Sequence, residues 1–198
     1  MKYGFQIMLL CFTGLFFSCN SNYTAGKKKG YFKIEFPKKE YRQFDEPGYP
    51  YTFEYPVYSN IVKDTSFFKE KPENPWWINI VIPQFDGSIY ISYKEIGAKN
   101  NYDSLVDDAF KMAYKQHTSK ASSIEPEEIV TQHNIRGIYF SLSGNTATAN
   151  QFFLSDSTRH FLRGALYFDA TPNEDSLGIV NAFLKKDIEH LINTLKWK

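Results

Sequence analysis

The sequence predicts an α+β fold in which one antiparallel sheet of about six to seven strands is covered by two helices. Three observations support this. Aromatic residues make up 18% of the 198 residues, and such residues favour strands and bury large areas. Runs that alternate between apolar and polar residues outnumber runs with helical spacing. Most segments between the runs are short enough for hairpins, which favours antiparallel pairing.

Four strands are predicted in the first half of the domain, at residues 31–36, 49–55, 76–82 and 88–93. The first alternates with a period of two and stops at a proline. The second has prolines at both ends, which predicts an edge strand. The last two are joined by a turn of about five residues and form a hairpin. Within this hairpin, Ile78, Ile80 and Ile82 are expected to face the core.

The pattern then changes to helical spacing. Asp103 or Ser104 is expected to cap a helix, and Asp107 would complete a capping box with Ser104. The apolar positions of this helix are Leu105, Val106, Ala109, Phe110, Ala113 and Tyr114. Residues 118–128 are polar and contain Pro126, so a loop is predicted there.

Three more strands, at residues 135–142, 147–154 and 159–168, precede a final helix at 175–195. Asp175 or Ser176 is its expected cap. Its apolar face comprises Val180, Phe183, Leu184, Ile188, Leu191, Ile192 and Leu195. Trp197 is expected to fix the chain end onto the sheet. The order β-β-β-β-α-β-β-β-α, ending in a helix and a tryptophan, resembles Mog1/PsbP-like folds, a resemblance that implies fold and no function.

The first 18 residues have the features of a lipoprotein signal peptide. Lys2 supplies a basic start, and residues 5–17 form an apolar run of signal length, too short to span a bilayer comfortably. Ser18 is small, and Cys19 follows it. This resembles a bacterial lipoprotein signal, in which the cysteine is lipidated and becomes the new N-terminus. An ordinary secretory signal or a single N-terminal anchor is the alternative.

The chain is therefore predicted to comprise a signal peptide at 1–18, a flexible tether at 19–30 and a single globular domain at 31–198. The tether is small, polar and basic. Its lysines, Lys27 to Lys29, belong to a solvated linker or contact lipid headgroups. Several acyl chains on Cys19, palmitate among them, would give stable membrane attachment.

Charge and motifs exclude several classes of function. Lysine and arginine number 23 against 22 acidic residues, a net charge of +1, which provides no strong field for nucleic acid. The two cysteines lie in the first twenty residues, so the domain has no disulfide framework or cysteine metal site. The sequence contains no G-x-S-x-G, H-E-x-x-H or phosphate-binding glycine motif. We therefore predict no enzyme, no catalytic residue, no metal site and no cofactor.

Residues 156–164 form the densest polar cluster. On the predicted strand, Arg163 and Tyr167 share one face and His160 lies on the other. Arg163 could bind a carboxylate or phosphate with two hydrogen bonds, or it could pair with a neighbouring Glu or Asp. Arg163, His160 and Tyr167 are the candidate partner contacts. Gly164 is expected to mark a bulge or a close helix approach.

The aromatic stretch 41–58 permits a second interpretation. Its rings could stack on sugars, which would make the protein a peptidoglycan- or glycan-binding module of the envelope. Alternatively, they pack on the edge of the sheet.

Several segments taken together resemble the gliding motility lipoprotein GldD family of Bacteroidetes. They are GYFKIEFP at 30–37, YTFEYP at 51–56, WINI at 77–80, ISYK at 91–94, the block from Asp156 to Leu177, and the closing Trp197-Lys198. The block is the most specific of these. The resemblance covers nearly the whole chain after Cys19.

The resemblance implies a cell-envelope lipoprotein that is needed for gliding and for the type IX secretion machinery. It implies partners among the other gliding and secretion proteins, and membrane attachment through Cys19, the one functional residue that carries over. It implies no catalytic residue. Surface lipoproteins of that phylum tend to carry acidic residues after the cysteine, and this tether has none. We therefore expect a lipid anchor in the outer membrane that faces the periplasm.

Overall fold

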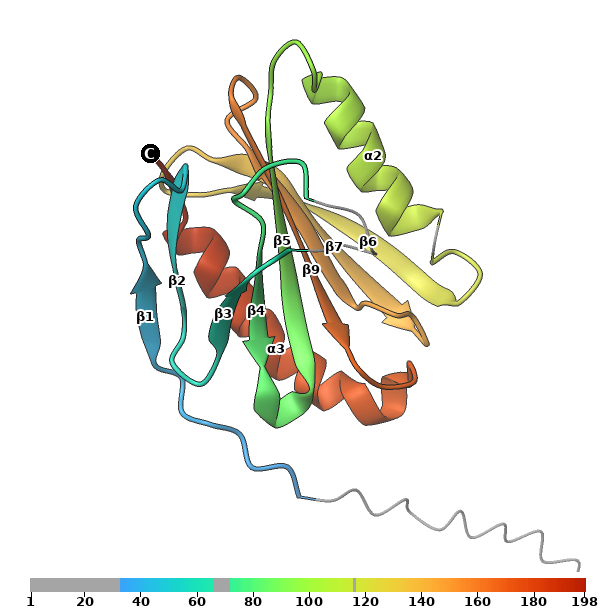
Figure 1. Ribbon diagram of the computed structural model, residues 1–198. Coiled ribbons are helices and arrows are strands. Elements are labelled where there is room, and N and C mark those ends of the chain that lie inside the picture. The colour runs from blue at the N-terminus through green and yellow to red at the C-terminus, as the bar shows by residue number, and fades with distance from the viewer. Residues whose placement is uncertain (1–32, 66–71, 116) are drawn as a thin grey trace, which may run out of the picture. The chain divides into compact units, whose positions relative to one another are not determined.

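The computed structural model describes residues 33–65, 72–115 and 117–198 (Figure 1). In these residues ten strands and two α-helices form, and residues Ile34–Lys198 belong to one compact unit. The predicted signal peptide and tether lie outside the described residues. No helix in the described part of the chain is both long and apolar enough to cross a membrane.

A seven-stranded antiparallel sheet forms the centre of the domain, in the order β3-β4-β5-β9-β8-β7-β6. The strands are β3 (Asn60–Lys63), β4 (Ile78–Ile82), β5 (Gly87–Glu95), β6 (Ala121–Val130), β7 (Arg136–Gly144), β8 (Asn150–Ser155) and β9 (His160–Phe168). The last four form consecutive hairpins, and β9 returns to pair with β5 along nine residues.

Helices α2 (Tyr102–Tyr114) and α3 (Glu174–Thr194) pack on opposite faces of this sheet (Figure 1). Neighbouring residues of one strand show this, because successive side chains point to opposite faces. Phe152 belongs to the core under α3, and Phe153 belongs to the core under α2. The expected α+β class with two helices is confirmed.

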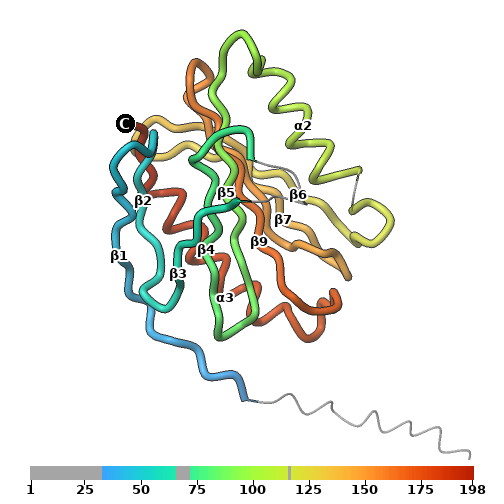
Figure 2. Tube along the Cα trace, viewed as in Figure 1, coloured from blue at the N-terminus to red at the C-terminus, as the bar shows by residue number. Residues whose placement is uncertain are grey.

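A second, three-stranded sheet packs against α3. It consists of β1 (Tyr41–Phe44), β2 (Tyr51–Pro56) and β10 (Lys196–Trp197), in the order β1-β2-β10. Figure 2 shows β1 and β2 beside β3. Rings of this small sheet, such as Phe44 and Phe53, join the same core as the buried face of α3. The predicted sheet of six to seven strands is the seven-stranded sheet. The small sheet was not predicted; it joins β2 to β1, its neighbour in sequence, and to β10 near the end of the chain.

Three predictions about strands need correction. Residues 33–36 form no strand; the ring of Phe36 stacks on Phe183 of α3 at 4.5 Å, so its alternation reflects packing on a helix. The stretch 49–55 is not an edge strand, because β2 pairs with β1 on one side and β10 on the other. The predicted loop at 118–128 is largely strand β6. Pro126 is tolerated there because β6 is the edge of the sheet, where one row of N–H groups needs no partner.

The helix caps and one glycine also differ from expectation. Asn101 caps α2 by accepting a hydrogen bond from the N–H of Asp103, and Asn173 caps α3 by accepting one from Ser176. Gly164 marks neither a bulge nor a helix approach. The ring of Phe152 lies over it, and a Cβ at this position would be 2.2 Å from that ring.

Other expectations are confirmed. β4 and β5 form the predicted hairpin, with Ile78, Ile80 and Ile82 fully buried. The predicted apolar face of the final helix is the face that packs on the core. Trp197 closes the chain end by pairing with Tyr51 in the small sheet.

Candidate functional site

Strand β9 carries all three predicted contact residues, and the structure separates them. Arg163 and Tyr167 lie on the α2 face of the sheet. His160 is buried on the opposite face, where the Tyr93 hydroxyl lies 2.6 Å from its Nδ1 atom and the Trp197 ring stacks on it. Successive side chains of a strand point to opposite faces, so His160 does not join Arg163 and Tyr167 in one surface.

The His160 environment favours a neutral imidazole. Burial lowers its pKa, and the nearby Asp156 carboxylate opposes that shift. Burial raises the pKa of Tyr93 to about 12, so its hydroxyl stays protonated and shares a hydrogen bond with His160 Nδ1. These groups satisfy each other within the core and have the features of a structural pair.

Arg163 has an unusual setting for a central strand residue. Its Nη2 atom donates to Oε1 of Gln151 at 2.6 Å. Burial lowers the pKa of its guanidinium, and the neighbouring Tyr167 opposes that shift through its charge and a hydrogen bond. In the part of the chain that the structure describes, no carboxylate forms an ion pair with Arg163. The alternative in which Arg163 pairs with a neighbouring acid is therefore not found.

The most concentrated polar cluster was not predicted from the sequence. Asp187 on α3 has a fully buried side chain and accepts three hydrogen bonds. Its donors are Lys39 Nζ at 2.6 Å, the Tyr41 hydroxyl at 2.9 Å and the Tyr58 hydroxyl. We call these four residues the Asp187 clasp. Buried carboxylates are retained only when paired and hydrogen-bonded in this way.

The clasp joins the segment before β1 to the middle of α3. Lys39 Nζ also donates to the backbone carbonyl of Phe183 at 2.9 Å and lies 3.3 Å from the centre of its ring. A cation over an aromatic face adds electrostatic attraction. Lys39 therefore contacts α3 through an ion pair, a hydrogen bond and a ring.

The protonation states of the clasp residues favour a structural role over a catalytic one. Burial lowers the pKa of Lys39, and Asp187 opposes that shift. Burial, together with the hydrogen bond to Asp187, raises the pKa of Tyr41 and of Tyr58. Both tyrosines therefore keep their protons and donate to the carboxylate. A protonated phenol with a raised pKa is a poor base or nucleophile.

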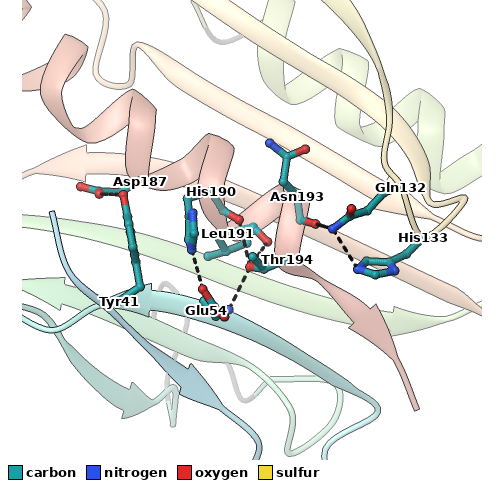
Figure 3. Close-up of polar contacts among 9 residues, drawn as sticks. All are labelled: Tyr41, Glu54, Gln132, His133, Asp187, His190, Leu191, Asn193 and Thr194. Atoms are coloured by element: carbon teal, nitrogen blue, oxygen red, sulfur yellow. Dashed lines mark hydrogen bonds and ion pairs between the residues drawn. The ribbon is translucent and has the colours of Figure 1, made fainter.

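A second contact extends the clasp toward β2 (Figure 3). His190 Nε2 lies 2.6 Å from Glu54 Oε2, and the Tyr41 ring stacks on the His190 ring with centroids 3.6 Å apart. The Glu54 N–H donates to Thr194 Oγ1 at 3.0 Å. The small sheet is thus fixed to α3 at two successive turns of the helix.

One sequence signal pointed to the clasp. Asp187 lies within the apolar face of the final helix, between Leu184 and Ile188, where a charge must find a partner. Its partners Lys39 and Tyr41 precede it by 148 and 146 residues. Nothing in the local pattern identifies residues at that distance.

The aromatic stretch 41–58 mostly lines the core. Tyr51, Phe53 and Tyr55 are buried, Tyr41 stacks on His190, and Tyr58 belongs to the clasp. The structure thus places these rings in packing positions. Among the described residues, no three His, Cys, Asp or Glu side chains gather to hold a metal ion.

Two solved structures are similar to this chain. The solution structure of cyanobacterial PsbP from Synechocystis sp. PCC 6803 is 8% identical, with 82% of this chain and 95% of that chain covered and a TM-score of 0.48. The crystal structure of the Saccharomyces cerevisiae Ran-binding protein Mog1p is 11% identical, with 81% and 96% covered and a TM-score of 0.45. No curated protein sequence matched.

The family comparison covers almost the whole chain after the predicted signal peptide. Residues 20–197 match the model described as gliding motility lipoprotein GldD. This range includes Arg163 and all four residues of the Asp187 clasp. The chain belongs to the gliding motility lipoprotein GldD family.

Proposed function

We propose that this protein is a non-catalytic envelope lipoprotein that supports gliding motility and the type IX secretion machinery through protein–protein contacts. Lipid on Cys19 would be its anchor, in the outer membrane and facing the periplasm. Membership of a lipoprotein family supports a lipid-anchored location in the cell envelope. The partners are expected among other gliding and secretion proteins.

The Asp187 clasp is the observation that carries this proposal. Lys39 and Tyr41 follow the predicted tether, which ends at residue 30, and their side chains are bound to a buried carboxylate of α3. The domain is thus built to hold the segment that leads to its anchor. A firmly tethered domain meets its membrane neighbours at high effective concentration, so each contact can be weak.

Crosslinking in cells tests the proposal. A tagged, lipidated protein would be recovered from crosslinked cells and compared with a Cys19→Ala variant. We expect gliding or secretion components to be enriched, and their recovery to fall with Cys19→Ala. Normal gliding and secretion in a clean deletion strain would refute the proposal.

A peptidoglycan- or glycan-binding module is the second candidate. An open groove of about 450 Å³ favours it, because the groove combines Trp76 with the amide and acidic side chains of Glu73, Asn74 and Asn100. Ligand pockets of this volume with a few polar groups are common. Retention of the full-length protein on purified sacculi, lost in a Trp76→Ala variant, would support this candidate. No retention would argue against it.

A further inference from the structure

Apolar side chains gather at the end of the domain where the compact unit begins. In Figure 1, the segment before β1, the turn between β4 and β5, and the first half of α3 lie together at the lower end of the domain. The turn is the 3₁₀ helix η2 (Pro83–Phe85). The ring centroid of Phe36 is 5.7 Å from that of Phe85 in this turn and 4.5 Å from that of Phe183 in α3. Rings from three segments thus form one cluster.

This cluster is open to water and continues into exposed side chains. Ile34 and Phe36 are each 37% exposed, and Ile179, one helical turn before Phe183 on the same side of α3, is 55% exposed. Three of the seven large apolar side chains that are exposed in the described part of the chain therefore lie at this end. We call Ile34, Phe36, Phe85, Ile179 and Phe183 the basal patch. Exposed apolar side chains that are grouped in this way mark an interaction surface.

Hydrogen bonds hold the segments of the basal patch together. The Gln84 side chain in the turn donates from Nε2 to the backbone carbonyl of Glu35 at 2.6 Å. Lys39 Nζ donates to the backbone carbonyl of Phe183 at 2.9 Å. The segment before β1 is thus fixed both to the turn and to α3. A surface that is already ordered loses little conformational entropy when it is covered.

The charges beside the patch limit how deeply it can enter a bilayer. Lys39 Nζ lies 3.3 Å from the centre of the Phe183 ring, and burial and the charge of the exposed Lys186 both lower the pKa of Lys39, so the two lysines lie close together. Lysine stems cover apolar surface while their ammonium groups reach the polar layer. Asp86, next to Phe85, is exposed, and a carboxylate is costly at the bilayer centre. This mixture of groups fits the boundary between headgroups and acyl chains.

The length of chain between the anchor and the compact unit keeps a membrane within reach. Ile34 is 15 residues after Cys19, the proposed lipid anchor. At about 3.3–3.6 Å per residue, this connection spans at most about 50 Å. The end of the domain that carries the attachment therefore meets the bilayer at the highest effective concentration. An apolar surface too small to hold a free domain on a membrane is sufficient to orient a tethered one.

We propose that the basal patch rests on the lipid bilayer that carries the anchor, with Ile34, Phe36 and Ile179 in contact with lipid at the level of the headgroups. The contact orients the domain and turns the C-terminal end of α3 away from the membrane. This rests on the proposed lipid anchor at Cys19, and it assigns the surface of the domain that faces the membrane.

Fluorescence quenching in vesicles, with the mature lipidated protein, tests the orientation. The two cysteines of the chain are Cys11, in the predicted signal peptide, and Cys19, whose sulfur the lipid occupies, so one introduced cysteine takes one label. The dye NBD is attached to Ile179→Cys in the patch or to Val130→Cys as the control. The vesicles contain phosphatidylethanolamine and phosphatidylglycerol, with a quenching nitroxide at carbon 5 or carbon 12 of an acyl chain.

Val130 is a matched control because it is also a branched apolar side chain and is 67% exposed. It lies near the other end of α3, since Gln132, two residues later, donates to the backbone carbonyl of Asn193 at 3.5 Å. Asn193 is about 20 Å along the helix from Ile179. We expect the nitroxide at carbon 5 to quench the label at position 179 at least about twofold more than the label at position 130, and more than the nitroxide at carbon 12 does.

Equal quenching at the two positions would overturn the proposal. It is also the result expected if the patch is reserved for a protein partner, because these vesicles contain lipid and no other protein. A second substitution separates the patch from the dye. Ile34→Ser should reduce quenching of the label at position 179 at least about twofold, because it removes apolar area from the contact. Val62→Ser, at a side chain that is 50% exposed on β3, should leave it unchanged. The same quenching in both variants would mean that the dye alone enters the lipid, and the patch would be refuted.

The orientation and the proposed function fail in different ways. If the mature protein floats with the vesicles while both labels are quenched equally, the anchor stands and the orientation is wrong. If a deletion strain glides and secretes normally while the label at position 179 is quenched selectively, the proposed function is wrong and the orientation stands. Thermal unfolding of each variant confirms that it is folded before these comparisons are made.

Discussion

Replacing Asp187 with asparagine should destabilise the domain by about 2–3 kcal/mol. The change keeps the shape of the side chain, removes its charge and replaces one acceptor oxygen by an NH2 donor. With the amide oxygen toward Lys39 and Tyr58, the Tyr41 hydroxyl has to accept instead of donate. Three donors reach this carboxylate, namely Lys39, Tyr41 and Tyr58. A hydrogen bond to a charged group contributes about 1.5–3 kcal/mol and a neutral one about 0.5–1.5, so each donor loses about 1 kcal/mol.

This sum is close to the lower end of the cost of breaking a buried ion pair, about 3–5 kcal/mol. The lower end is appropriate because the Lys39 side chain is 27% exposed and recovers some hydration when its partner changes. For a domain of this size, 1 kcal/mol corresponds to about 2–4 °C in Tm. We therefore expect Tm to fall by about 4–12 °C in Asp187→Asn.

Urea unfolding at pH 7, followed by tryptophan fluorescence, measures the change in the free energy of unfolding. The m-value should stay constant, so that the midpoint reports stability. Asp45→Asn is the matched control, since Asp45 is also 2.6 Å from a lysine, Lys198, but is 61% exposed. Exposed pairs contribute about 0–1 kcal/mol. A loss in Asp187→Asn below about 1 kcal/mol, or equal to that of the control, would refute the stabilising role of the clasp.

Three further predictions concern other parts of the domain. Burial holds the pKa of His160 below its ordinary value, so on acidification the unfolded chain binds this proton at a higher pH than the folded domain does. The contribution of His160 to the free energy of unfolding should be complete above pH 7 and should fall as the pH drops through about 6.5. Urea titrations at pH 7.5, 6.5 and 5.5 measure this dependence, which should be flatter in His160→Gln. Gly164→Ala should lower the free energy of unfolding by about 1–3 kcal/mol, because the added Cβ would lie 2.2 Å from the Phe152 ring. Gly97→Ala is the control: its Cβ would have no atom within 4 Å, so stability should change by less than about 0.5 kcal/mol. Pro126→Val should restore the missing donor on edge strand β6 and promote edge-to-edge association; sedimentation that shows the same monomer as wild type at high concentration would contradict this.

The elements that the sequence predicted well carry strong local patterns. The isoleucines of β4 alternate without interruption, and apolar residues recur at helical spacing in α3 from Val180 to Ile192, so both elements follow from periodicity. β6 was missed because Pro126 argues against a strand unless the strand is known to be an edge. That knowledge depends on the order of all seven strands, which no local pattern contains.

The small sheet and the clasp could not be predicted for the same reason. β2 pairs with β10, and Tyr51 lies opposite Trp197, almost the length of the domain away in sequence. Lys39 reaches Asp187 across a similar separation. The faces of β9 were predictable, because strand alternation is local, and this correctly placed Arg163 with Tyr167 and apart from His160.

The position of the clasp has a mechanical consequence for a domain that is pulled from its N-terminal side. Tension that enters at Ile34 reaches Lys39 before it reaches Tyr41, which forms the first ladder pair of β1 with Pro56. Pulled from a free end, a hairpin opens like a zipper, one bond at a time. At Lys39 the force passes into the middle of α3, which lies on the large sheet, and β1 can begin to peel only after Lys39 and Tyr41 have left Asp187. Stretching experiments on single molecules should therefore show an initial rupture force that drops when Asp187 is neutralised.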